Sequence, residues 1–179
     1  FTGKKEDIQD LEILGTAITE NLGIGNIRND KYLELGNQGT GNLTVEGMKN
    51  IKNEITIAFW ANGNEKVLPA NNSIFYAEDK NKNRQLNVHL PWSNARVYWD
   101  CGGDATGYDR IDKATITSEY KGKWNHWAFT KNVNSGSMKI YLNGQLWHSS
   151  TGKTKPIFID QFVIGSDITN NSPYYGLID

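Results

Sequence analysis

The sequence contains a single cysteine, Cys101, among 179 residues. One cysteine excludes an internal disulfide and a zinc cage built from several cysteine thiolates. It also disfavours a cysteine nucleophile paired with a histidine, since no other feature of the sequence supports such a pair. We therefore interpret Cys101 as a small, partly buried residue at the end of a strand.

An excess of charge of one sign and long apolar runs are also missing. The formal net charge is −1, from 19 basic and 20 acidic residues, so no overall field favours a polyanion and we expect no nucleic-acid partner. The short basic runs at 80–84, 121–123 and 153–155 alternate with polar residues, a pattern typical of solvated edge strands. No apolar segment approaches the length that crosses a bilayer, so we expect no membrane insertion.

What the sequence does contain is a succession of short strand-like runs separated by Gly, Asn and Asp. The clearest is a hairpin over 137–149, where alternating apolar and polar residues flank Asn143-Gly144, the dipeptide that best accepts the positive φ angles of a type I′ turn. Further strands are predicted at 31–35, 55–61, 73–77, 85–90, 96–101, 124–131 and 158–164, and only 4–14 and 45–52 could be helical. The pattern predicts one all-β domain over 1–179, a two-sheet antiparallel sandwich with very little helix.

Several motifs then occur in a recognisable order. A Trp-x-His strand begins at Trp124, the Tyr-Leu-Asn-Gly hairpin follows from Tyr141, an Ile-Gly strand end lies at Ile164, and Gly-x-Ile-Asp closes the sequence from Gly176. In this order the chain resembles the laminin-G-like domain of the concanavalin A-like lectin/glucanase superfamily, strongly over 124–179 and more faintly over 31–61. The resemblance implies a jelly-roll sandwich.

The resemblance gives function only by class, because one fold hosts many functions. It implies an accessory domain of a secreted or surface-attached protein, often a bacterial one that handles polysaccharides, and we expect an extracellular or cell-surface bacterial location. The sequence begins at Phe1 and stops at Asp179, where the family usually continues into one more strand. We therefore expect a fragment of a larger chain, with other domains of the parent chain as partners.

A catalytic role is disfavoured. Retaining glycoside hydrolysis needs two carboxylates about 5 to 5.5 Å apart, and the glucanases of this superfamily carry Glu-x-Asp followed by another Glu. That run is missing here: Asp10 and Glu12 stand in the reverse order, and the adjacent Glu78 and Asp79 would point to opposite faces of a strand. No Gly-x-Ser-x-Gly elbow accompanies the histidines. We expect a binding domain and not an enzyme.

Carbohydrate binding requires aromatic faces beside polar groups that bond hydroxyls. The stretch 90–110 has that composition, and loops at both ends of its central strand are where binding residues tend to lie. The predicted ligand-binding residues, for a polysaccharide or other glycan, are Trp92, Asn94, Arg96, Asp100, Asp109 and Arg110. Trp92 could equally be a lid over the core, and we expect Trp60, Trp124 and Trp127 to be core residues.

Two alternatives stay open. Relatives of this kind often hold calcium, and Asp79, Asp104 and Asp167 offer the hard oxygen ligands it prefers, although no EF-hand spacing is present. The second alternative is a protein-interaction, adhesion or structural module, which would present a flatter patch of roughly 800 Å² per partner.

Overall fold

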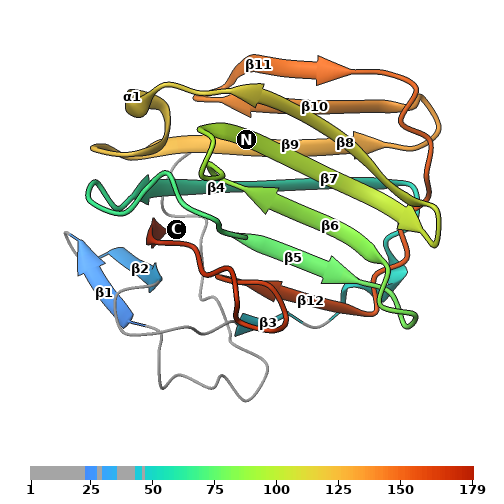
Figure 1. Cartoon of the computed structure of the whole chain (residues 1–179), viewed down its shortest axis with the longest axis horizontal. Coiled ribbons are helices and arrows are strands. Elements are labelled where there is room, and N and C mark those ends of the chain that lie inside the picture. Colours follow the sequence, from blue (N-terminus) through green and yellow to red (C-terminus); the bar gives the residue numbers. More distant parts are fainter. Residues whose placement is uncertain (1–22, 28–29, 36–42, 46) are drawn as a thin grey trace.

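The computed structural model describes residues 23–27, 30–35, 43–45 and 47–179, which form two antiparallel sheets that face each other (Figure 1). The strands are β1 (Gly23–Ile27), β2 (Asp30–Leu35), β3 (Leu43–Thr44), β4 (Glu54–Gly63), β5 (Phe75–Glu78), β6 (Arg84–His89), β7 (Arg96–Asp104), β8 (Gly107–Ala114), β9 (Asn125–Asn132), β10 (Ser137–Leu142), β11 (Gln145–Ser150), β12 (Gln161–Ile164) and β13 (Gly176–Ile178). Within these ranges the helical elements are the short turns η3 (Met48–Asn50) and α1 (Thr117–Tyr120). The predicted all-β sandwich with very little helix is confirmed.

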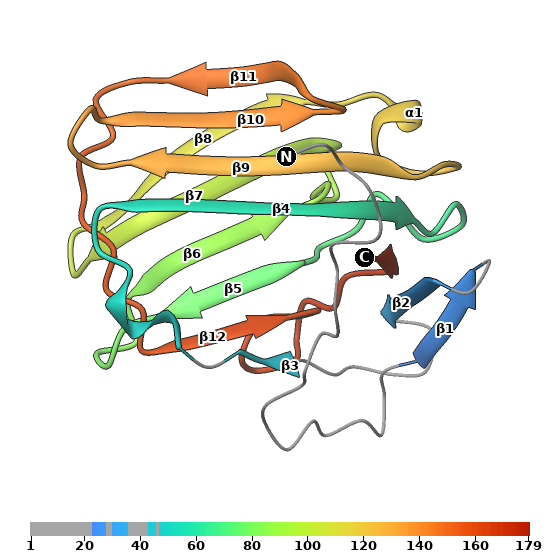
Figure 2. The ribbon, with the colours of Figure 1, turned by 180° about the vertical axis from the view of Figure 1, so that it is seen from behind.

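The two sheets differ in their strand order. One has the strand order β1-β2-β13-β4-β9-β10-β11, and the other has the order β3-β12-β5-β6-β7-β8. Figure 2 shows β4, β9, β10 and β11 in front of β5 to β8. Strands distant in sequence become neighbours, so β4 pairs with β9 and β12 pairs with β5. Residues from separate parts of the chain therefore share one sheet face.

The local predictions succeed where alternation is regular. The hairpin β10–β11 turns at Asn143 and Gly144, whose φ angles are 50° and 79°, as a type I′ turn requires. Strand β8 was not predicted, because its sequence Gly-Tyr-Asp-Arg-Ile-Asp-Lys-Ala is mostly polar on both faces. The helix considered at 45–52 is reduced to η3, and the one considered at 4–14 lies outside the described residues.

The core lies between the sheets and is rich in aromatic side chains. Trp99, Trp127 and Phe129 are fully buried, and the Phe129 ring stacks on Phe59 with centroids 5.9 Å apart. The expectation that Trp60 is a core residue is wrong, since its side chain is 41% exposed. It follows buried Phe59 by one position on β4, and successive strand residues point to opposite faces.

A buried ion pair also lies on the inner side of the six-stranded sheet. The Lys131 ammonium, fully buried on β9, donates to Asp109 Oδ2 at 2.6 Å and to the Cys101 carbonyl at 2.6 Å. Cys101 is fully buried inside β7 and not partly buried at its end, because β7 continues through a bulge at Gly102. Gly102 has φ 77°, and a Cβ there would collide with the Lys155 carbonyl.

The position of Asp109 predicts that its substitution affects folding. Asp109→Asn should lower the free energy of unfolding by roughly 3–5 kcal/mol, because Lys131 would be left buried without its counter-charge. The control is Asp112→Asn on the same strand, where the bond to Arg96 is partly exposed and is worth at most about 1 kcal/mol. Urea unfolding of both variants measures the difference, and equal losses would contradict this role for Asp109.

Candidate binding pocket

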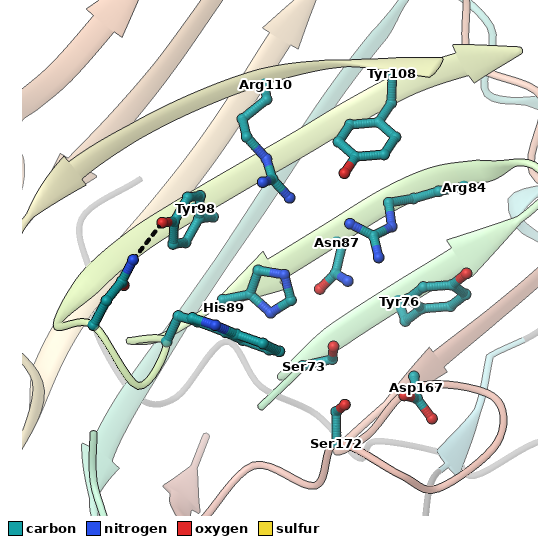
Figure 3. Close-up of a pocket in the computed structure, with 12 residues that line it drawn as sticks. Ser73, Tyr76, Arg84, Asn87, His89, Tyr98, Tyr108, Arg110, Asp167 and Ser172 are labelled. Atoms are coloured by element: carbon teal, nitrogen blue, oxygen red, sulfur yellow. Dashed lines mark hydrogen bonds between the residues drawn. The ribbon is translucent and has the colours of Figure 1, made fainter. Parts of the chain in front are cut away.

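A pocket of about 340 Å³ opens on the face of the six-stranded sheet that points away from the core (Figure 3). Period-two alternation sets this face: on β7, Val97 and Trp99 point into the core, while Tyr98 and Asp100 point to the pocket side. Strands β5, β6, β7 and β8 and the segments beside β12 all contribute. The lining side chains are Ser73, Tyr76, Arg84, Asn87, His89, Trp92, Asn94, Tyr98, Tyr108, Arg110, Asp167 and Ser172.

The floor of the pocket is organised by the carboxylate of Asp100, which is fully buried. From β8, Arg110 Nε donates to Asp100 Oδ1 at 2.5 Å and Arg110 Nη2 donates to Oδ2 at 2.8 Å. From β6, Arg84 Nη1 donates to Oδ2 at 2.7 Å. These bonds raise the pKa of Arg110 and fix both guanidinium groups at the pocket floor.

Tyrosine rings hold the same two guanidinium groups from the sides. The Arg84 guanidinium carbon lies 4.7 Å from the Tyr108 ring centroid and 5.7 Å from that of Tyr76. The Arg110 carbon lies 4.7 Å from the Tyr98 centroid and 5.1 Å from that of Tyr108. Cation–π attraction of this kind favours the orientation in which the arginine side chains lie.

The turn between β6 and β7 carries the tryptophan of the pocket. Buried Asn72 anchors its start: Asn72 Oδ1 accepts from the Leu90 N–H at 3.0 Å, and Asn72 Nδ2 donates to the Pro91 carbonyl. The half-buried Trp92 ring packs edge-on against His89, with centroids 4.4 Å apart. Asn94 Nδ2 then donates to the Tyr98 hydroxyl at 2.7 Å. The turn is thus tied to the sheet at both ends.

His89 is an uncharged hydrogen-bond acceptor in the wall of the pocket. Its Nδ1 donates to the Asn72 carbonyl, and since a carbonyl only accepts, Nδ1 carries the ring proton. Burial lowers the pKa of His89 to about 4, so the ring is uncharged at neutral pH. Nε2 of the neutral ring is then a hydrogen-bond acceptor.

Asn87 supplies a second acceptor. Its side chain lines the pocket in the space between His89 and Arg84 (Figure 3), and its residue is 1% exposed. The Oδ1 atom is buried and has no hydrogen-bond partner within the protein. Leaving such an atom unsatisfied is costly, and a hydrogen-bond donor is what would satisfy it.

The structure brings together some of the predicted ligand residues and separates others. Trp92, Asn94 and Arg110 line the pocket, and Asp100 lies beneath it. Arg96 bonds Asp112 outside the pocket, and Asp109 faces the core. Sequence reasoning missed Tyr76, Arg84, Asn87 and Tyr108; the alternation of Asn87 with His89 and of Tyr108 with Arg110 carried the signal, but not which strands would be neighbours.

The three acids considered for calcium do not meet. Among the residues that the structure describes, no group of three or more His, Cys, Asp or Glu side chains is placed to hold a metal ion. Asp79 accepts from the backbone of Asn83 within its own turn, and Asp167 lines the pocket. Both oxygens of Asp104 accept from Lys155 Nζ at 2.7 Å, which lowers the pKa of Asp104 to about 2. These residues do not fit a calcium site.

Comparison with known proteins gives a family and several similar folds. The family model Laminin_G_3, described as the concanavalin A-like lectin/glucanases superfamily, matches residues 35–179. A search of curated proteins found no match. Domain 4 of AbnA, a GH43 extracellular arabinanase from Geobacillus stearothermophilus solved with arabinotriose, superimposes with a TM-score of 0.65 at 18% identity, covering 88% of this chain and 72% of that one.

Binding domains of botulinum neurotoxins are similar as well. The serotype G binding domain gives a TM-score of 0.63 at 16% identity over 88% of this chain, and the receptor-binding domain of the mosaic serotype C/D gives 0.66 at 18% over 89%. The chain spans 40% and 39% of those two domains. At these identities the likeness concerns the fold.

The low pKa of His89 predicts a pH-dependent stability. Between pH 6.5 and about 4 the unfolded chain binds more protons at this residue than the folded chain, so the free energy of unfolding falls as pH falls, by up to about 1.4 kcal/mol per pH unit. Burial lowers the pKa of His148 too, with the same sign. Urea unfolding between pH 7 and pH 5 should show a slope that His89→Gln flattens and His148→Gln largely retains. An unchanged slope in His89→Gln would contradict the assignment.

Proposed function

The chain belongs to the concanavalin A-like lectin/glucanase superfamily, and on this premise we propose that it is a non-catalytic glycan-binding domain whose site is the pocket over β5 to β8. The observation that carries the proposal is the composition of that pocket. Trp92 and three tyrosines provide apolar ring surface, and two arginines, Asn87 and neutral His89 provide donors and acceptors. A sugar ring presents the same combination of apolar faces and hydroxyl edges.

The arrangement of carboxylates supports binding without catalysis. Hydrolysis of a glycosidic bond by the common route needs two carboxyl groups on either side of the bond. Among the lining residues the only acid is Asp167, and the carboxylate of the nearby Asp100 is buried and bonded by two arginines. The lining residues therefore do not offer the two opposed carboxyl groups that this route requires.

The comparisons favour a binding role of the same kind. The arabinanase domain was solved with arabinotriose, and the toxin domains are named as binding or receptor-binding domains. A protein-interaction module is the second candidate, but a concave site of about 340 Å³ suits a small ligand better than the flat patch of a protein interface.

We further infer an extracellular domain of a larger protein, acting without bound calcium. None of the helices among the described residues is long and apolar enough to span a membrane.

The proposal is tested by a glycan-array and affinity-gel screen, followed by titration of the best ligand. Trp92→Ala should weaken that ligand roughly tenfold or more, because the apolar ring surface is lost. Trp60→Ala removes a tryptophan that is 41% exposed on the other sheet, and it should leave affinity unchanged. Binding should be the same in EDTA.

Two results would overturn the proposal. One is a folded protein that binds no glycan, which would favour a protein-interaction module. The other is a glycan whose affinity falls with Trp60→Ala and not with Trp92→Ala, because the site would then lie on the other sheet.

A further inference from the structure

The pocket floor has an unbalanced positive charge. Arg84 and Arg110 share one carboxylate, that of Asp100, so one guanidinium charge has no partner on the floor. Two other acids of the same sheet are already paired: Glu78 bonds Lys82, and Asp112 bonds Arg96. His89 adds no charge, since it is neutral near pH 7.

The remaining acid of the pocket lies at the far side. Figure 3 shows Arg110 and Tyr108 along one edge and Asp167 with Ser172 at the opposite edge, beyond Tyr76. The pocket is therefore polarised, with donors and positive charge along β6 to β8 and a carboxylate beside β12. A ligand with an anionic group has one favourable orientation in such a field.

The N–H donors of the two arginines are also oriented before a ligand binds. Three of the N–H groups of the two guanidinium groups are given to Asp100, and each guanidinium has five. The remaining N–H groups lie in two planes already fixed by Asp100 and the tyrosine rings. A carboxylate is the group that such a fork binds best, because two parallel N–H bonds match its two oxygens.

Asn87 gives an independent indication. The buried, unpartnered Oδ1 of Asn87 lies on the face of β6 that lines the pocket, and Asn87 is opposite Asp100 of β7 in the strand register. It needs a donor such as a hydroxyl or an amide N–H, so a ligand that is only an inorganic anion would leave it unsatisfied. A sugar acid supplies both groups at once, a carboxylate and neighbouring hydroxyls.

We propose that the pocket is selective for an acidic sugar unit, a uronic or sialic acid, whose carboxylate binds Arg84 and Arg110 while a hydroxyl or amide donates to Asn87. This inference rests on the proposed glycan-binding function and specifies its ligand class. The Trp92 ring then covers an apolar part of the sugar, and Asp167 and Ser172 accept or donate at the other end.

The experiment compares probes that differ only in the carboxylate. Oligogalacturonate is titrated beside its carboxyl-reduced counterpart, and 3′-sialyllactose is titrated beside lactose, by calorimetry with the full chain. The acidic member of at least one pair should bind roughly tenfold to a hundredfold more tightly, as expected for charge-assisted hydrogen bonds. The pair that shows the difference identifies the kind of sugar acid. A sulfated oligosaccharide and free acetate are included as further arms.

The variants separate recognition from folding. Arg110→Lys keeps a positive charge on Asp100 but loses the planar fork, and it should reduce the preference for the acidic probe about tenfold. Arg96→Lys is the matched control, an arginine on β7 that bonds Asp112 outside the pocket, and its preference should equal that of the wild type. The melting temperature shows that each variant is folded.

The outcomes distinguish this inference from the function on which it rests. Equal binding of acidic and neutral probes, still lost in Trp92→Ala, would overturn the acidic ligand and keep the glycan site. Stronger binding of the sulfated probe would overturn the carboxylate, and acetate alone binding as tightly as the sugar acid would overturn the role of Asn87. No binding of any sugar would remove both proposals.

Discussion

The buried carboxylate of Asp100 is the constraint around which the pocket is arranged. It lies on β7, directly opposite Arg110 on β8 and opposite Asn87 on β6, so three adjacent strands meet at this group. Taking a carboxylate out of water is costly, and arginine bonds return that cost only when their geometry is good. Buried ion pairs in proteins can often be replaced by apolar residues without loss of stability. The charged arrangement therefore has its best explanation in what it does to the arginines, which is to hold them as oriented donors at the base of an open pocket.

The inner face of the same sheet also carries a buried ion pair. Asp109 precedes Arg110 on β8 and points to the core, where it neutralises the buried ammonium of Lys131 from the opposite sheet. The bulge on β7 at Gly102 permits this contact, because the Cys101 carbonyl then accepts from the same ammonium and the Lys155 segment packs close to the glycine. Two neighbouring residues of β8 thus pair with buried charges on opposite faces of the sheet. The pair on the inner face contributes to folding, and the pair on the outer face is part of the site.

Period-two alternation explains how much of this was predictable. The composition of the stretch 90–110 located Trp92, Asn94 and Arg110, whereas alternation, together with the Asn143-Gly144 dipeptide, located the sandwich and the type I′ hairpin. Alternation could not say which strands lie side by side, so Arg84 and Tyr76 were missed. Adjacent residues of a strand point to opposite faces, but the ligand residues were chosen by composition, so Asp109 was grouped with Arg110 although only the latter lines the pocket. Trp60 illustrates the same point on β4, because a large aromatic residue was assigned to the core against its own alternation.

Strand pairing and hydrogen bonds hold the pocket residues in place, and this affects how the pocket would bind a ligand. Its arginines, tyrosines and Asn87 project from paired strands, and the turn that carries Trp92 is held by the buried amide of Asn72 at one end and by the Asn94–Tyr98 bond at the other. A ligand that enters would not have to order these groups, so less of its interaction energy is spent on lost side-chain freedom. Burial keeps His89 neutral at neutral pH, and the bonds to Asp100 raise the pKa of Arg110, so the charges of these two residues are constant there as well. A pocket of fixed shape and fixed charge discriminates by fit. Its selectivity should then follow from where a sugar places its anionic group, its hydroxyls and its apolar face.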